Sequence, residues 1–251
     1  MDWRTRARDG LVVLLTVTTG SVDAACFMHL GHVFSSVITG TLVLLGVAAG
    51  TQTGALAQSC GVALASYTAG VAVAAPVAAR RAGRWLDGWP ASRAARPVAH
   101  REIWPSWLTV ALALEFCVLA AFCAGWELAG GHPGRGVQLL LLIPAGSAMG
   151  IQSTTVRQLG EVSTTYLTGT LTGVVAALAT GRVPDGLGRS LGIFAAVVAG
   201  AVGSAVITTY APLLLPLLVL TPLALVVWIA STRFGPRPGT ANPAPGSPAA
   251  R

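Results

Sequence analysis

Two acidic side chains stand inside long apolar stretches of this sequence, where ionisable groups are costly. Asp23 lies in the apolar stretch 11–30, and Glu115 lies near the middle of 107–128. An acid at mid-depth in a bilayer costs about 2.5–3.5 kcal/mol on insertion scales. We therefore expect both carboxyls to face the protein interior, either paired or protonated. One interpretation is a proton or cation site; the other is a structural carboxyl that hydrogen-bonds to a neighbouring helix.

Two Thr-Gly-Thr triplets offer a different chemistry, since their hydroxyls and exposed backbone suit a small polar ligand. The alternative is close helix packing through small residues, which is common in membrane bundles. The triplets are Thr39, Gly40 and Thr41, and Thr168, Gly169 and Thr170.

Other motifs point away from metal, cofactor and hydrolase chemistry. Residues 188–192 fit G-x-S-x-G, but a nucleophile elbow needs a strand before it, and here a basic loop precedes an apolar stretch. The four cysteines form no C-x-x-C pair and no His/Cys metal spacing. Walker A, H-E-x-x-H and dinucleotide-binding glycine patterns are absent from the sequence. We expect no enzyme activity, no cofactor and no metal.

The elements that must position these residues are membrane spans. The chain has 251 residues, of which 53% are hydrophobic and 10% charged, whereas soluble domains carry about 25% charged residues. We predict an all-α polytopic membrane protein with six spans, because each stretch approaches the roughly 20 residues that cross a bilayer. The predicted spans are 11–30, 55–79, 107–128, 138–156, 190–210 and 212–231.

Two further apolar segments, 36–51 and 165–181, are short and interrupted by Gly and Thr. If both enter and return without crossing, the N-terminus, the basic 80–106 loop, the 157–189 region and the tail share one side. The other side then keeps only Arg135. This six-span arrangement fits the positive-inside rule better than eight spans, so we expect both termini in the cytoplasm.

The net charge and the composition of the C-terminal segment lead to further expectations about partners and disorder. The formal net charge is +7 and every basic residue is arginine, lying in loops beside apolar spans. The positive-inside rule accounts for this basicity, so we expect no nucleic-acid partner. The segment 233–251 is rich in Pro, Gly and Ala, and we expect it to be disordered. A single bundle over 1–232 follows, in the inner membrane of a bacterium.

An internal repeat relates the two halves, about 10–128 and 138–231. The segment LGHVFSSVITGTL, 30–42, aligns without gaps to LGEVSTTYLTGTL, 159–171, with seven identities in thirteen. The same offset of 129 residues places Asp23 opposite Gln152. Three crossings separate the copies, so the halves are predicted to be inverted. In such folds, short Gly-interrupted segments at matching places point to a site near the midplane.

These regions resemble the signatures of the YoaK-like family of bacterial membrane proteins, domain of unknown function 1275. Thr41 stands where the family pattern has Asn, so no amide role is carried over to it. The resemblance covers roughly 10–231 and implies a polytopic membrane protein. The matching residues are Asp23-Ala24, Gly31, Phe34 and Thr39-Gly40 in the first region, and Gly150, Gln152, Arg157, Gly160, Thr164-Thr165 and Thr168-Gly169-Thr170 in the second.

Together these features predict a transporter or permease for a small polar solute, coupled to a proton or cation through Asp23. The candidate site comprises Asp23, Glu115, Gln152 and the two triplets. We expect the Thr triplets to approach each other near mid-membrane, with Asp23 and Gln152 beside them. A passive channel and a non-transporting membrane partner or structural protein are the alternatives. The expected partners are the lipid bilayer and an unidentified solute, and the oligomeric state stays open.

Overall fold

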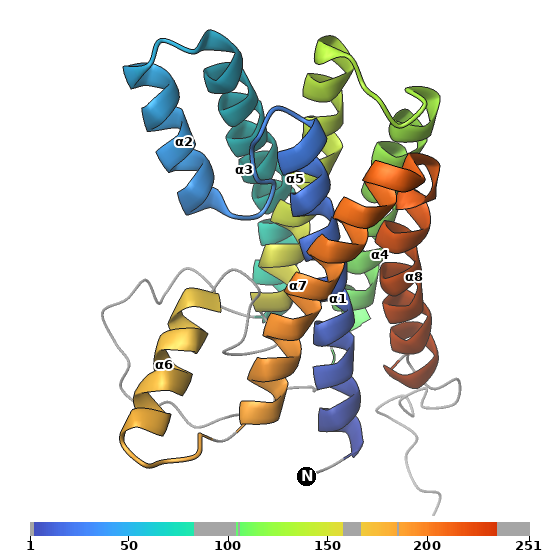
Figure 1. The fold of residues 1–251 in the computed structure, drawn as a ribbon. Helices are drawn as coiled ribbons and strands as arrows, with labels where there is room; N and C mark the ends of the chain where they lie inside the picture. The colour runs from blue at the N-terminus through green and yellow to red at the C-terminus, as the bar shows by residue number, and fades with distance from the viewer. Residues whose placement is uncertain (1–2, 83–103, 105, 158–166, 185, 235–251) are drawn as a thin grey trace, which may run out of the picture.

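The computed structural model describes residues 3–82, 104, 106–157, 167–184 and 186–234. Over these residues the chain is helical, without strands (Figure 1). The helices are α1 (Trp3–His29), α2 (Ile38–Gly50), α3 (Gly54–Ala82), α4 (Ser106–Leu128), α5 (Arg135–Arg157), α6 (Leu167–Ala179), α7 (Leu187–Tyr210) and α8 (Leu215–Phe234), with a 3-10 turn, η2 (Pro212–Leu214), before α8.

Six of these helices are long and apolar enough to cross a membrane. Each matches one of the spans expected from the sequence, so the prediction of an all-α bundle with six candidate spans is confirmed. Their apolar parts are Arg6–His29, Gly54–Pro76, Trp107–Leu128, Arg135–Arg157, Leu187–Tyr210 and Pro212–Arg233.

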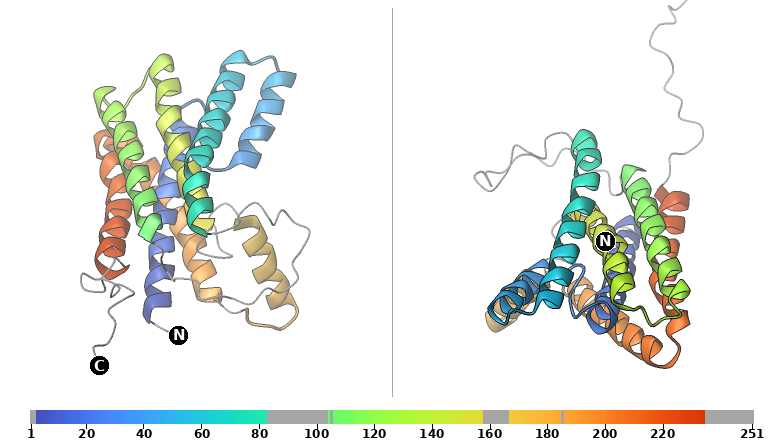
Figure 2. Two further views of the ribbon diagram at one scale, coloured as in Figure 1. Left: turned by 180° about the vertical axis from the view of Figure 1, so that it is seen from behind. Right: turned by 90° about the horizontal axis from the view of Figure 1, so that it is seen from above.

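The six long helices run alternately up and down the bundle (Figure 1). The N-terminal end of α1 and the last turn of α8 therefore lie at the same end (Figure 2). α1 and α5 are the most buried of the six. α1 packs mainly on α7, and α5 packs mainly on α3. α1 and α5 therefore form the centre of the bundle, with α7 and α3 each packed on one of them and α4 and α8 against one side.

Both close pairs depend on glycine at the crossing. A Cβ on Gly20 of α1 would collide with the backbone carbonyl oxygen of Val197 in α7. A Cβ on Gly150 of α5 would collide in the same way with the carbonyl oxygen of Tyr67 in α3. Small residues permit such approach of helix backbones in membranes, where packing rather than water drives association.

The two short helices occupy corresponding places in the chain. α2 and α6 have 13 residues each. α2 packs beside α3 at the end of the bundle where α1 finishes, and α6 lies at the opposite end, near the start of α7 (Figure 1). At a rise of about 1.5 Å per residue, neither helix is long enough to cross about 30 Å of hydrocarbon.

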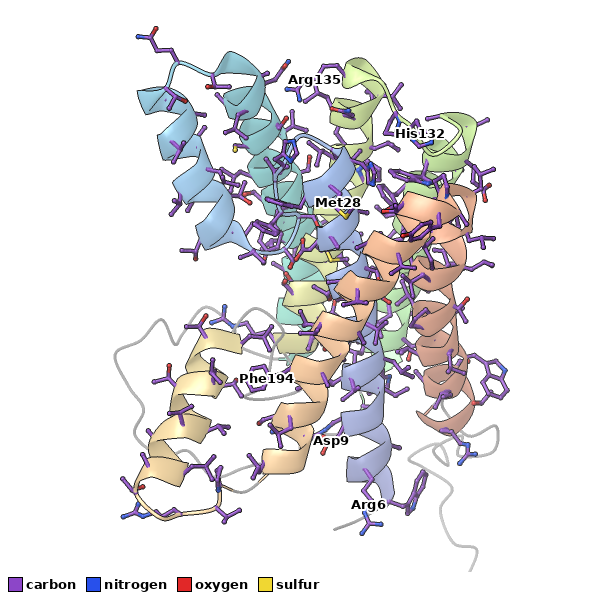
Figure 3. The ribbon with its side chains drawn as sticks, in the orientation of Figure 1. Arg6, Asp9, Met28, His132, Arg135 and Phe194 are labelled. Atoms are coloured by element: carbon purple, nitrogen blue, oxygen red, sulfur yellow. The ribbon has the colours of Figure 1, made fainter. Side chains whose placement is uncertain are left out.

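The basic side chains gather at one end of the bundle. Figure 3 shows Arg6 and Asp9 at the end where α1 begins, and His132 and Arg135 at the other. Arg135 is the only arginine at that second end among the described residues.

Most of the 80–106 loop lies outside the described residues, as does the tail beyond Phe234. α8 extends two residues into the segment expected to be disordered, ending immediately before Gly235-Pro236, where a helix is readily terminated.

Candidate functional site

The segment between α1 and α2 turns sharply back into the bundle. After α1 ends at His29, Gly31 and His32 both adopt positive φ angles, of 92° and 59°. A left-handed conformation is uncommon for a residue other than glycine, so His32 must be held there by its surroundings. Its ring stands edge-on to Phe27, at 5.7 Å between centroids. Phe27 also stacks on Phe34 at 5.0 Å, which fixes the returning segment against α1.

The carboxylate of Asp23 binds the polar groups of this returning segment. Its Oδ1 atom accepts hydrogen bonds from the backbone N–H groups of Ser35 and Ser36, each at 2.8 Å, and from the Ser35 hydroxyl at 2.7 Å. The Ser36 hydroxyl donates to the other carboxylate oxygen. Asp23 is only 8% exposed. These contacts satisfy two amides that would otherwise be unpaired in an apolar environment, where each would be costly.

A cavity of about 930 Å³ lies beside Asp23. The first turns of both short helices contribute to its wall: Thr39 from α2, and Thr168 with Gly169 from α6. α1, α7 and the segment between α1 and α2 form the rest of the wall, with Thr19 and Asp23 as the polar residues of α1 and Ser36 as that of the segment. Met28, labelled in Figure 3, is among its apolar residues. The cavity therefore combines an apolar surface with a few hydroxyls and one carboxyl, as small-molecule sites commonly do.

A second polar cluster lies deeper in the bundle. The amide of Gln152 donates to Glu115 Oε1 at 2.9 Å, and the Gln152 carbonyl oxygen accepts from the Thr19 hydroxyl at 2.5 Å. Glu115 is fully buried, and its Oε2 atom has no hydrogen-bond partner among the described residues. Because Thr19 also lines the cavity, the two polar clusters meet at α1.

Some of the expected site residues come together and others do not. Asp23, Thr39, Thr168 and Gly169 line one cavity. Thr41 instead turns inward, where its hydroxyl donates to the carbonyl oxygen of Phe34 at 2.9 Å. The remaining residues expected at the site, Gly40, Thr170, Gln152 and Glu115, are not among those that line the cavity.

Gln152 therefore lies elsewhere than expected from its repeat position opposite Asp23. It is 1% exposed and contacts α1 and α4, whereas Asp23 binds the segment before α2. The reason is local: Glu115 on α4 and Thr19 on α1 flank α5 and together satisfy both ends of the amide.

Three residues of the site were missed from the sequence. Ser35 and Ser36 supply all four hydrogen bonds to Asp23, and Thr19 joins Gln152 to the cavity. Two features of the sequence could have identified these residues. Thr19 precedes Asp23 by four residues, which places both on one helix face. Ser35-Ser36 aligns with Thr164-Thr165 in the repeat, so both copies carry paired hydroxyls there.

Other candidates fall outside this site. Ser190 of the G-x-S-x-G match lies in the first turn of α7, where it is 8% exposed. Glu161, which follows Arg157 by four residues and by that spacing is expected to pair with it, lies outside the described residues. All four cysteines are free. In the part of the chain that the structure describes, no group of three or more His, Cys, Asp or Glu side chains is placed to hold a metal ion.

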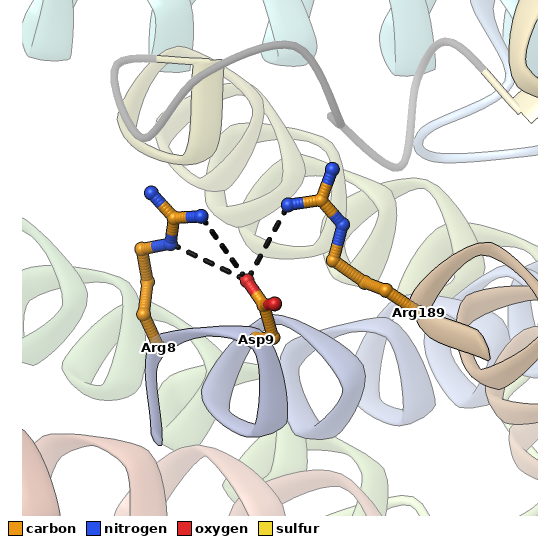
Figure 4. Close-up of polar contacts among 3 residues, drawn as sticks. All are labelled: Arg8, Asp9 and Arg189. Carbon is orange, nitrogen blue, oxygen red and sulfur yellow. Dashed lines mark hydrogen bonds and ion pairs between the residues drawn. The ribbon is translucent and has the colours of Figure 1, made fainter. Parts of the chain in front are cut away.

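An ion cluster joins α1 to α7 at the end where the chain begins (Figure 4). Asp9 Oδ1 lies 3.2 Å from Nη2 of Arg8 and 3.4 Å from Nη1 of Arg189. These side chains are partly exposed, so the cluster contributes modestly to stability. It is separate from the cavity, since none of the three residues lines it.

Comparison with known proteins gives the family. The family described as a protein of unknown function (DUF1275) matches residues 11–230. The UPF0700 transmembrane protein YoaK of Bacillus subtilis (strain 168) is 34% identical over 166 residues, which are 65% of this chain. The aligned region spans 64% of that relative, slightly less than two thirds of its length. No solved structure matches this chain. With the family match extending from α1 to α8, this multi-pass membrane protein belongs to the DUF1275 family.

Proposed function

We propose that the protein is a secondary transporter for a small polar solute, which binds in the cavity beside Asp23. The observation that carries the proposal is the meeting of a buried carboxylate with the first turns of two short helices at one cavity. Helices that begin inside a bundle leave backbone N–H groups without helical partners. In a membrane such groups are tolerated only against protein or a polar cavity.

The arrangement of the two short helices supports an inverted repeat around this cavity. α6 begins and ends 129 residues after α2, the offset at which the sequence aligns to itself. The main helix pairs correspond as well, because α1 with α7 becomes α5 with α3 under the same offset. Transporters built from such repeats place their site where the halves meet.

Coupling to a proton or cation is inferred from the hydrogen bonds that Asp23 accepts. As a carboxylate it accepts four hydrogen bonds, two of them from backbone N–H groups that can only donate. Oδ2 accepts only the Ser36 hydroxyl, so a proton on this oxygen lies beside Ser36, whose hydroxyl can turn to accept it. Ser36 lines the cavity, so a change of charge on Asp23 changes the wall that a solute contacts.

Uptake by whole cells tests the proposal. Strains that lack the protein, express it, or express Asp23→Asn are compared by untargeted measurement of accumulated metabolites. We expect at least one polar metabolite to accumulate only with the unaltered protein, and a protonophore to abolish the accumulation. Asp9→Asn is the matched control, because it makes the same change on α1 outside the cavity, and it should retain uptake.

The outcomes separate the alternatives. Uptake that survives both the protonophore and Asp23→Asn contradicts coupling and indicates a passive channel. No metabolite difference between expressing and lacking strains contradicts transport altogether and favours a non-transporting role.

A further inference from the structure

The fully buried carboxyl of Glu115 has no part in the cavity wall, yet a chain of two hydrogen bonds connects it to that wall. The chain runs from Glu115 Oε1 to the Gln152 amide and from the Gln152 carbonyl oxygen to the Thr19 hydroxyl. The three side chains come from α4, α5 and α1, so the chain crosses the centre of the bundle.

Glu115 is poorly satisfied as a charged group. A carboxylate offers about four lone-pair sites, and only one of them is occupied here. The second oxygen, Oε2, is buried without a partner among the described residues. An ionised carboxylate in that position would be far more costly than a neutral one. Asp23 differs sharply, because its carboxylate accepts four hydrogen bonds.

No ion pair compensates Glu115 within the described part of the chain. α4 packs against α5, α8 and α3. Glu115 makes no salt bridge to the basic groups on these helices, and the ion pairs found involve Asp9. The cluster also suits a metal cation poorly, because Gln152 points its N–H group toward Glu115 and its carbonyl oxygen away from it. The titratable and charged side chains placed on the surrounding helices are Cys117, Cys123 and Glu127 on α4, Arg135 and Arg157 on α5, Arg233 on α8, Cys60 and Tyr67 on α3, and Arg6, Arg8, Asp9, Asp23, Cys26 and His29 on α1.

We propose that Glu115 is a second, buried proton-binding site whose protonation state is communicated to the cavity through Gln152 and Thr19. The site deepens the proposed function, since the communication matters only if a solute occupies that cavity. In this assignment the proton resides on the Glu115 carboxyl. Gln152 is a positioning residue, and Thr19 is the end of the chain that a solute can contact.

The chemistry of the amide explains how the signal passes. An ionised Glu115 can only accept, so it holds the N–H side of Gln152 toward itself. A protonated Glu115 can do either: its carbonyl oxygen can accept the Gln152 N–H group, as it does here, or its hydroxyl can donate to the carbonyl side of a reversed amide. Reversal presents the Gln152 N–H group to Thr19. The Thr19 hydroxyl must then accept, and its own hydrogen turns to the carbonyl oxygen of Leu15, 3.1 Å away.

Infrared spectroscopy of the purified protein in lipid vesicles tests the proposal without any knowledge of the solute. A protonated carboxyl has a carbonyl stretching band distinct from that of a carboxylate. We expect such a band at neutral pH, lost in Glu115→Gln and retained but shifted in Glu115→Asp. Glu127→Gln is the matched control, because Glu127 is exposed at the end of the same helix, and it should leave the band unchanged.

The positioning role of Gln152 has its own signature. Gln152→Leu removes the hydrogen-bond partner of Glu115 and should shift the band of the remaining carboxyl, whereas Asp23→Asn should not. A band absent from the unaltered protein between mildly acidic and neutral pH, or unchanged in Glu115→Gln, would overturn the assignment. The infrared experiment measures no transport. If the bands are as expected but the uptake experiment fails, only the proposed transport is rejected, and the assignment of the proton to Glu115 stands.

Discussion

At the scale of single residues, Asp23 anchors the segment that leads into α2. No side chain caps α2 at Val37, the residue that precedes it. The carboxylate of Asp23 instead binds the two amides just upstream, from a helix more than ten residues earlier in the chain. A single side chain thereby holds the segment before the short helix and forms part of the cavity wall.

Asp23→Ala should therefore destabilise the protein strongly. It leaves the amides of Ser35 and Ser36 unpaired, at a cost of about 1–3 kcal/mol for each buried group. Ser36→Ala is the comparison, because it removes one hydroxyl donor and leaves both amides paired, costing about 0.5–1.5 kcal/mol. Thermal unfolding in detergent measures both. Equal stability of the two variants would show that the carboxylate does not hold this segment.

The importance of Asp23 could be predicted from the sequence, but its partners could not. A carboxyl within an apolar span must face protein, and that argument needs only position and cost. Which groups it meets depends on the backbone reversal at Gly31 and His32, and a left-handed histidine leaves no clear signal in sequence. Gln152 shows the same limit, because its partners come from α1 and α4 rather than from its own half.

At the scale of helices, close contact through glycine sets the two most closely packed pairs, α1 with α7 and α3 with α5. Gly70 and Gly150 lie where α3 meets α5, and any Cβ there would meet backbone atoms, which cannot move aside as a side chain can. The six spans could be predicted because length and apolar content decide them. The pairing of α1 with α7 and α3 with α5 could not, since glycines are spread along most of the chain.

Gly150→Ala should separate α3 from α5 and lower the unfolding temperature. The added methyl group would overlap the carbonyl oxygen of Tyr67, and overpacking of this kind costs about 1–3 kcal/mol. Gly61→Ala in α3 is the matched control, because a Cβ there has nothing within 4 Å. It should be neutral or slightly stabilising, since alanine favours helix. A Gly150→Ala variant as stable as Gly61→Ala would mean that the helices are not in close contact there.

At the scale of the whole molecule, the distribution of arginines indicates how the bundle is oriented in the membrane. The end where α1 begins carries the other described arginines, whereas Arg135 is the only arginine at the opposite end among the described residues. We infer that the first end faces the cytoplasm. Reporter fusions after Arg96 and after Arg237 should both report the cytoplasm, and a fusion after Gly134 should report the opposite side. A periplasmic signal at Arg96 would reject the six-span topology.

The proposed function requires that the cavity beside Asp23 admit a solute from water. Its most direct test is the reactivity of single cysteines, introduced after the four native cysteines have been replaced. Thr39→Cys and Thr168→Cys place a thiol on the cavity wall. Val43→Cys and Val175→Cys are the matched controls on the same two helices, because Val43 and Val175 are 63% and 54% exposed and do not line the cavity.

The measurement is labelling of these thiols in membrane vesicles by a small, charged methanethiosulfonate reagent and, separately, by a lipid-soluble maleimide. We predict that the charged reagent modifies positions 39 and 168 but neither control, whereas the maleimide modifies the controls. Positions 39 and 168 that react only with the lipid-soluble reagent would show that these residues face lipid. That result would contradict the existence of a solute site beside Asp23.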